Sequence, residues 1–295
     1  MVLQIANITK DTPDLLPLLA EAYDRVFVPA FPVPESRESL DKFTRAMNGS
    51  IPGVSIIINV MGENLADADK RVIKGFSVAY YYEKHGVGLL AYNAIAPQAR
   101  EKGLGKIMVQ SRIQSLKQRA QDAGKPLAGV FVDVNDPTKV RAEDDGMDPV
   151  KRLQIFTNWG ARKTPVDYVQ PPLEAGGNYC DTMLLLNYPV DGKYASRNAI
   201  EMFLRSMYRE CRQNQRPEED YFFRKMKAQL DAAPAHTIAD AHTCPEPGYM
   251  KDTPSFVYLK SAFKTAAAPR VLMAAAAPRV QRVQRPVHTD QPRQG

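Results

Sequence analysis

The chain contains little cysteine: Cys180, Cys211 and Cys244 are the three cysteines among its 295 residues. They are far apart and odd in number, and none belongs to a CxxC pair, so their spacing offers no metal site. The same pattern is typical of a reducing compartment. We therefore predict a cytoplasmic protein that needs no metal.

A long hydrophobic run is also missing. The longest apolar stretches, residues 54–61 and 271–277, are far shorter than the roughly 20 residues that cross a bilayer. Residues 1–10 show no basic start followed by an apolar segment, so they do not predict a secretory signal. We expect no membrane partner.

Net positive charge is small outside the C-terminal end. The net charge is +6, but residues 265–295 hold five Arg and one Asp, a balance of +4, which leaves about +2 for all other residues. That end also lacks aromatic side chains, which stack on nucleic-acid bases in many binding grooves. These features argue against nucleic-acid binding by the folded part. The hydrophobic share of 44% and the charged share of 24% are those of a soluble globular protein.

The apolar periodicity predicts the element order β-α-α-β-β-β-α-β-α-β-β up to residue 190. Such an order is typical of an α/β fold in which helices flank a mixed, mainly antiparallel sheet. The predicted strands cover residues 2–8, 54–61, 72–84, 87–96, 129–135, 164–168 and 182–187, and the predicted helices cover residues 13–28, 36–47, about 105–123 and 149–160.

Beyond residue 190 the pattern changes. An apolar stripe with helical spacing runs from Ile200 to Cys211, and a second begins after Pro217. These helices could cover the main sheet or form a homodimer surface. From residue 233 the chain is rich in Ala and Pro, a composition typical of disorder. We therefore expect a domain at residues 1–190, a helical extension at 191–232 and an irregular to disordered tail at 233–295.

The segment from Ile95 to Lys106 carries the clearest chemical signal. A strand runs into a loop with two glycines, which opens directly into a helix. The first N–H groups of a helix lack internal partners, and the helix dipole adds positive charge, so a pyrophosphate fits there. Arg100, Lys102 and Lys106 would add charge for phosphates. The glycines alone fit a tight turn equally well.

The spacing of this segment excludes two common phosphate motifs and resembles a third. It lacks the third glycine of a dinucleotide fingerprint and the Gly-Lys-Ser/Thr of a Walker loop. The pattern Ile95-x-Pro97-x-x-Arg100-x-x-Gly103-x-Gly105 resembles the acyl-CoA loop of the GNAT superfamily of N-acyltransferases. The element order over about residues 2–188 is also similar to that of the family.

The resemblance implies a binding mode for acetyl-CoA, or a related acyl-CoA, as co-substrate. The strand ending at Ile95 would part from the strand at 129–135, and pantetheine would lie in the gap, pairing with the backbone near Asn93, Ile95 and Ala96. Asn135 matches an Asn often found near the cofactor, although it fits a strand-end turn equally well. The pyrophosphate would lie against the loop formed by Arg100, Glu101, Lys102, Gly103, Leu104, Gly105 and Lys106.

The catalytic groups are less clear. Asp133 lies in a strand whose valines occupy the other face, and a carboxylate in that position is either paired or functional. Glu83 could reach the acceptor as an alternative base, although an exposed hairpin position suits it as well. Many members of the family use a Tyr as general acid where this chain has Phe156. Tyr168 or Thr157 could supply that proton instead.

The acceptor itself is not specified by the sequence. The resemblance implies a primary amine that attacks the acyl group directly, and we expect a small molecule rather than a protein. Phe27, Phe31 and Glu35 would line its side of the site, and Tyr92 would hydrogen-bond it; each fits the hydrophobic core or a rigid loop as well. Because Phe156 lacks an acidic proton, a non-catalytic acyl-CoA-binding module is the alternative, as is an interaction protein that no longer binds the ligand.

Overall fold

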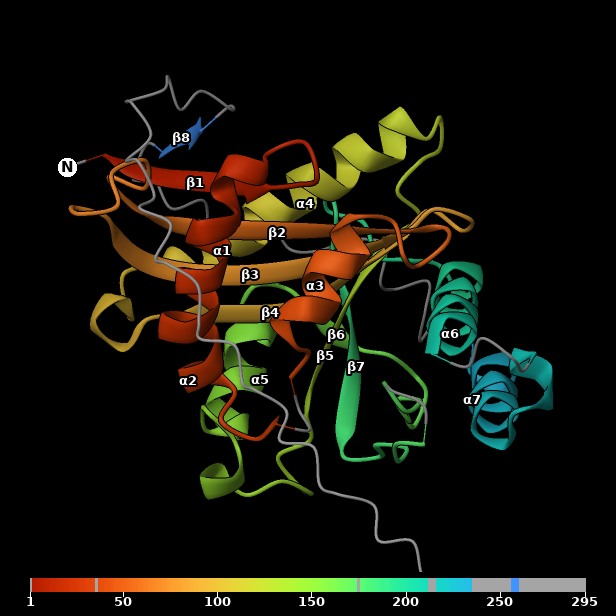
Figure 1. The fold of residues 1–295 in the computed structure, drawn as a ribbon. Coiled ribbons are helices and arrows are strands. Elements are labelled where there is room, and N and C mark those ends of the chain that lie inside the picture. The colour runs from red at the N-terminus through yellow and green to blue at the C-terminus, as the bar shows by residue number, and fades with distance from the viewer. Residues whose placement is uncertain (1, 35–36, 174–175, 212–215, 235–255, 260–295) are drawn as a thin grey trace, which may run out of the picture. The chain divides into compact units, whose positions relative to one another are not determined.

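The computed structural model describes residues 2–34, 37–173, 176–211, 216–234 and 256–259. In these residues, eight strands form one sheet in the order β6-β7-β5-β4-β3-β2-β1-β8 (Figure 1). The strands are β1 (Leu3–Ile8), β2 (Val54–Glu63), β3 (Val72–Tyr82), β4 (Val87–Ile95), β5 (Gly129–Asn135), β6 (Arg162–Lys163), β7 (Met183–Tyr188) and β8 (Phe256–Leu259). The helices are α1 (Leu16–Ala22), α2 (Val28–Ala30), α3 (Leu40–Met47), α4 (Leu104–Asp122), α5 (Pro149–Asn158), α6 (Arg197–Cys211) and α7 (Tyr221–Ala232).

The sheet is mixed and mainly antiparallel, as predicted. Only β4 with β5 and β1 with β8 run parallel. The central strands β2 and β3 are buried on both faces, which explains why their sequences read as nearly continuous apolar runs.

Helices cover both faces of the sheet, and each face has its own apolar cluster. On one face, Leu18 of α1, Phe43 of α3 and Phe203 of α6 belong to the larger cluster. On the other, Leu116 of α4 and Phe156 of α5 pack in the smaller cluster. Figure 1 shows α1 and α3 in front of the sheet, with α4 behind it. Among the described helices, none combines the length and the apolar character that crossing a bilayer requires.

The predicted helix at 13–28 is a series of short helical pieces. A 3-10 turn at Pro13–Leu15 leads into α1, and a π-helical turn at Tyr23–Phe27 joins it to α2. The second predicted helix begins later than residue 36, because the hydroxyl of Ser39 accepts from the Lys42 amide at 3.1 Å and caps α3. Ser36 lies outside the described residues.

One strand prediction was wrong, and one short strand was not predicted. Residues 164–168 were expected to form a strand, but β6 ends at Lys163. Thr164 still donates its amide to Leu185, and Pro165, which has no N–H to donate, follows. In the tail predicted to be irregular, Phe256–Leu259 instead pairs with β1 as β8, and its Phe-Val-Tyr sequence has high β propensity. The rest of the tail from residue 235 lies outside the described residues.

Of the two C-terminal helices, α6 packs on the sheet and α7 packs on α6. Phe203 of α6 stacks on Phe131 of β5 with ring centroids 4.6 Å apart, and Tyr208 of α6 meets Phe223 of α7 at 5.6 Å. Helix α7 begins after Asp220, whose carboxylate accepts from the amides of the first turn.

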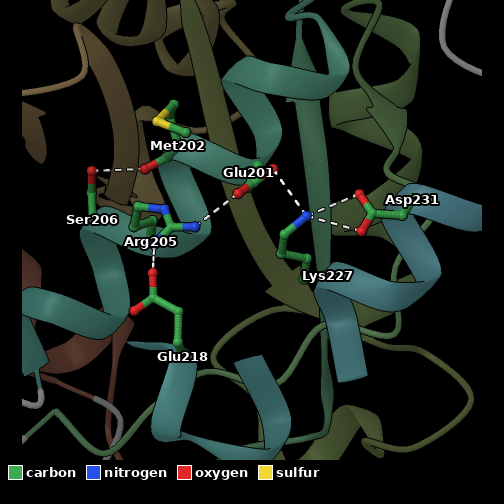
Figure 2. Close-up of polar contacts among 7 residues, drawn as sticks. All are labelled: Glu201, Met202, Arg205, Ser206, Glu218, Lys227 and Asp231. Atoms are coloured by element: carbon green, nitrogen blue, oxygen red, sulfur yellow. Dashed lines mark hydrogen bonds and ion pairs between the residues drawn. The ribbon is translucent and has the colours of Figure 1, made fainter. Parts of the chain in front are cut away.

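Ion pairs also join α6 to the α7 region (Figure 2). Glu201 accepts from Arg205 at 2.8 Å and pairs with Lys227 at 3.4 Å. Arg205 also pairs with Glu218, and Lys227 pairs with Asp231 at 2.9 Å. Lys227 of α7 is therefore linked to Glu201 of α6, and Arg205 of α6 is linked to the turn that precedes α7.

Candidate functional site

The loop between β4 and α4 exposes backbone amides. A 3-10 turn at Pro97–Ala99 is followed by two residues with left-handed backbone, Glu101 (φ 65°) and Gly103 (φ 72°). Gly103 is the N-cap residue of α4, and no side chain caps the helix. The first amides of α4 are therefore available to an anion, as the sequence predicted.

The two glycines of the loop meet different requirements. A Cβ on Gly103 would have nothing within 4 Å, so this position needs glycine for its backbone angle rather than for space. A Cβ on Gly105 would lie 3.3 Å from the ring of Trp159. The Trp159 ring packs against the Phe156 ring, with ring centroids 5.4 Å apart. Trp159 is a neighbour of the loop that the sequence did not indicate.

Positive side chains surround these amides. Arg100 and Lys102 are exposed and Lys106 is half-buried. The Arg100 Nε donates to the Ile95 carbonyl at 3.2 Å, which ties the loop to the end of β4. The carboxylate in the loop, Glu101, lies 3.5 Å from Lys151 of α5. The loop therefore keeps its cationic character.

Strands β4 and β5 part where the resemblance predicted a gap. They pair only at Val87–Gly129, Gly88–Val130 and Leu89–Phe131, and β4 then continues to Ile95 without a partner on that side. An irregularity in the β3–β4 ladder accompanies the separation, since Tyr80 pairs with Leu89 but Val78 pairs with Tyr92.

The buried guanidinium of Arg112, from α4, holds this irregularity in place. Its Nη1 donates to the Val78 carbonyl at 2.9 Å and to the Tyr92 carbonyl at 2.8 Å. The extra residue that β4 carries between these pairs bends it away from β5.

The backbone of β4 directs alternate amides into the gap. The Ala96 amide donates to the carbonyl of Lys74 in β3 at 2.9 Å, so the amides of Ile95 and Asn93 point the other way, toward β5. The Asn93 side chain donates to the Gly105 carbonyl at 3.3 Å, and its own oxygen is buried without a partner. The gap thus lies directly beside the first turn of α4.

Asn135, at the end of β5, has a structural contact. Its amide donates to Asp145 at 2.9 Å, and Asp145 also accepts from Arg152 of α5 at 2.7 Å. This network fixes the loop that precedes α5. The sequence suggested that Asn135 either lies near the cofactor or is a turn residue at the strand end. The hydrogen bond to Asp145 fits the second role.

Asp133 of β5 is a carboxylate on the face of the larger apolar cluster. Strand alternation puts it on the face of Phe131, opposite Val132 and Val134. Gln170 donates to its carboxylate at 3.0 Å. The pKa of Asp133 is raised to about 6, chiefly by burial and also by the charge of Glu38, while hydrogen bonds from its own backbone and from Gln170 oppose the shift.

Tyr168 and Tyr92 lie close to Asp133. The Tyr168 side chain is 2% exposed and its hydroxyl has no hydrogen-bond partner. Burial, and then the charge of Asp133, raise the pKa of Tyr168 well above its ordinary value. The pKa of Tyr92 is raised by burial and by the charges of Glu38 and Asp133. Both hydroxyls therefore remain protonated at physiological pH.

Two aromatic residues expected to bind the acceptor differ in exposure. Phe31 is half-buried and packs on Tyr92 with centroids 5.1 Å apart. Phe27 is fully buried and contacts the Tyr92 ring at 5.0 Å, so in this structure it is a core residue. Glu35 lies outside the described residues.

The structure does not bring Glu83 or Thr157 to this place. Glu83 follows β3, accepts from Ser55 at 2.7 Å and is exposed at the hairpin. The whole of β4 separates it from the loop, a strand that covers about 25 Å. The Thr157 hydroxyl donates to carbonyls of its own helix. Phe156 packs in the smaller apolar cluster, on the opposite face from Asp133.

A second polar group, which the sequence did not reveal, lies on the same face as Asp133. We define the Glu38–Glu210 cluster as Glu38, Lys42, Tyr80, Tyr82 and Glu210. Tyr80 donates to Glu38, and Lys42 lies 2.8 Å from the same carboxylate. The Glu210 Oε2 is buried without a partner. Burial and the charge of Glu38 raise the pKa of Glu210 to about 7.

Neither carboxylate of this cluster belongs to a sequence motif. The one available signal was the position of Glu210, which directly flanks the apolar stripe of α6.

Within the described residues, no group of three or more His, Cys, Asp or Glu side chains is arranged to hold a metal ion. Cys180 and Cys211 are free thiols, and Cys244 lies outside the described residues.

Comparison with known proteins gives matches only among solved structures, since no protein-family model and no curated protein matches the sequence. A protein of Bacteroides thetaiotaomicron assigned to the GNAT family is 19% identical, with a TM-score of 0.43 over 64% of this chain and 88% of the other. A spermidine N-acetyltransferase of Vibrio cholerae, in complex with CoA and spermine, is 14% identical, with a TM-score of 0.39 over 62% and 94%.

A third solved structure names a different kind of acceptor. The ribosomal-protein-S18-alanine N-acetyltransferase of Escherichia coli is 15% identical, with a TM-score of 0.38 over 63% of this chain and 94% of the other. The solved structures that this chain resembles are thus named for acetyltransferases with different acceptors. These likenesses assign neither an acceptor nor a residue role to it.

Proposed function

We propose that this chain is a member of the GNAT superfamily that transfers an acetyl or other acyl group from acyl-CoA to a primary amine. One observation carries the proposal: β4 parts from β5 directly beside the uncapped first turn of α4. A gap for an extended chain and a site for phosphates are thereby contiguous. The motif from Ile95 to Gly105 supports the same function.

The donor is held by backbone groups in this proposal. The amides around Gly103 and Gly105 bind the pyrophosphate, with Arg100 and Lys102 adding charge. The backbone of Asn93 and Ile95, which faces the gap, pairs with the amides of the pantetheine arm. The Ile95 amide also donates to the thioester oxygen and stabilises its developing negative charge.

Asp133 acts as the base. It accepts a proton from the acceptor ammonium, and the neutral amine attacks the thioester carbon. The C–S bond breaks as the new C–N bond forms, CoA leaves as thiolate, and the second proton of the amine passes to the thiolate sulfur, so that free CoA thiol and protonated Asp133 remain. A pKa of about 6 keeps Asp133 ionised at neutral pH while its basicity exceeds that of an exposed Asp. Tyr168, which stays protonated beside Asp133, relays this proton to sulfur.

Calorimetry with acetyl-CoA, followed by a thiol-release assay with a panel of small amines and several acyl-CoAs, tests the proposal. We expect binding and amine-dependent release of free CoA. Absence of acetyl-CoA binding would reject the function and favour the interaction-protein alternative. Phe156, placed where many relatives have an acid, favours one other candidate, a non-catalytic acyl-CoA-binding module. Binding without turnover of any amine would support that candidate.

A further inference from the structure

The Glu38–Glu210 cluster contains more buried negative groups than positive ones. Glu38 is 6% exposed, and within the described residues its one ionic partner is Lys42, which also donates to the Leu173 carbonyl at 3.1 Å. Glu210 lies near both of them and adds a second carboxyl. The charge of Glu38 also raises the pKa of Asp133. This region therefore contains the carboxyl groups of Glu38, Glu210 and Asp133 and the ammonium group of Lys42.

Two buried polar atoms in this region have no partner. The Glu210 Oε2 is buried and accepts no hydrogen bond. The Tyr168 hydroxyl, which interacts electrostatically with Asp133 and Cys211, neither donates nor accepts a hydrogen bond. An orphan carboxylate oxygen costs free energy unless it finds a donor. Its chemistry calls for a cationic hydrogen-bond donor.

Tyr92 connects this region to the acyl-transfer site. It lies on β4, whose backbone faces the gap, and the charges of Glu38 and Asp133 both raise the pKa of its hydroxyl. A molecule with one amine at Asp133 therefore has Tyr92 and Glu38 among its polar neighbours, and Glu210 interacts with Glu38. A molecule carrying a carboxylate at that far end would meet two carboxyl groups instead.

We propose that the acceptor carries a second cationic group, and that Glu210, with Glu38, holds this group while the reacting amine lies at Asp133. The acceptor class is a diamine or a related dication. This inference rests on the proposed function, since it concerns the acceptor side of the same site. Glu210 is a specificity-determining residue and takes no part in the transfer of the acyl group.

The test compares putrescine with butylamine, which has the same carbon chain and one amine. In the wild-type protein we expect kcat/KM to be about tenfold higher for putrescine, the factor that one buried charge-assisted hydrogen bond supplies. Glu210→Gln keeps the shape of the side chain and should remove the preference while changing butylamine turnover less than about twofold. Glu219→Gln removes an equal charge from an exposed position and should leave the preference intact.

Proton release gives a second readout, independent of turnover. The titratable groups facing Glu210 are Glu38, Lys42, Tyr80, Tyr82 and Cys211. A bound cation favours ionised Glu210, so putrescine binding near pH 7 should release protons. Calorimetry with putrescine alone, in buffers of different ionisation enthalpy, measures this, and Glu210→Gln should release fewer.

The outcomes separate the two proposals. Equal kcat/KM for putrescine and butylamine would overturn the inference and leave acyl transfer standing. Equal losses for both amines in Glu210→Gln would also overturn it, because Glu210 would then have a structural role. If acetyl-CoA does not bind, the proposed function fails, and putrescine binding by the wild type but not by Glu210→Gln still decides the inference.

Discussion

The donor side and the acceptor side of the candidate site are built in different ways. The donor side is one continuous segment, from Asn93 to Lys106, that runs from a strand through a loop into a helix. The acceptor side collects groups from α3, β3, β4, β5 and α6, and Glu38 and Glu210 are far apart in the sequence. The donor side binds through backbone groups and depends on the backbone conformation. The acceptor side binds through side chains and depends on which residue stands at each position. Substitutions should therefore affect the two sides differently.

Gly103→Glu should have the largest effect. It places a side chain and a negative charge where the pyrophosphate is expected, and acetyl-CoA affinity should fall about a thousandfold. Gly124→Glu is the matched control, because Gly124 has φ +65° and open space around it at the other end of α4. It carries the same strain and charge, and calorimetry should find wild-type affinity. Equal losses in both variants would mean that the backbone strain, not the site, is responsible.

Asp133→Asn should have the next largest effect. The amide cannot accept the amine proton, so kcat/KM should fall about a hundredfold at neutral pH. The limb of the pH–rate profile that rises through about pH 6 should disappear, since that is where Asp133 loses its proton. Glu83→Gln, at the far hairpin, should keep the limb. If Glu83→Gln abolishes the limb and Asp133→Asn keeps it, the base is misassigned.

Glu210→Gln should stabilise the protein at high pH. The folded-state pKa of Glu210, about 7, exceeds the ordinary value of 4.5, so folding favours its protonated form. Its contribution to stability is full below about pH 4.5 and is lost as the pH rises through 7. The variant should gain about 2 kcal/mol over wild type near pH 8, allowing for partial exposure, and little near pH 5. Urea unfolding at both pH values measures this, and an equal gain at both would contradict the shift.

Glu201→Gln should have the smallest effect. It removes the carboxylate that joins Arg205 and Lys227, and partly exposed pairs of this kind contribute about 1 kcal/mol or less. Thermal unfolding should detect a small loss that shrinks at high salt. The putrescine preference should persist, because Phe203 and Tyr208 still hold α6 in place. Loss of the preference would show that the acceptor side depends on this ion-pair network.

The sequence predicted most of what local patterns control. Alternation and helical spacing located the central strands, α4, α5 and α6, and the motif spacing located the loop at Gly103. It misplaced the strand near 164–168, where Pro165 ends the pairing, and it missed β8, whose four residues lie in an Ala- and Pro-rich region. It also missed Glu38 and Glu210, because long-range packing alone brings them together.

The separation of β4 from β5 has a consequence for the sheet itself. Beyond Leu89 and Phe131, each strand presents a row of backbone groups that no neighbouring strand satisfies. Such rows act as templates, and a chain of amides is what completes them. A bound pantetheine arm would therefore serve this sheet as a short extra strand. Donor binding should then slow hydrogen exchange at Asn93 and Ile95, so the donor contributes to the architecture as well as to the reaction.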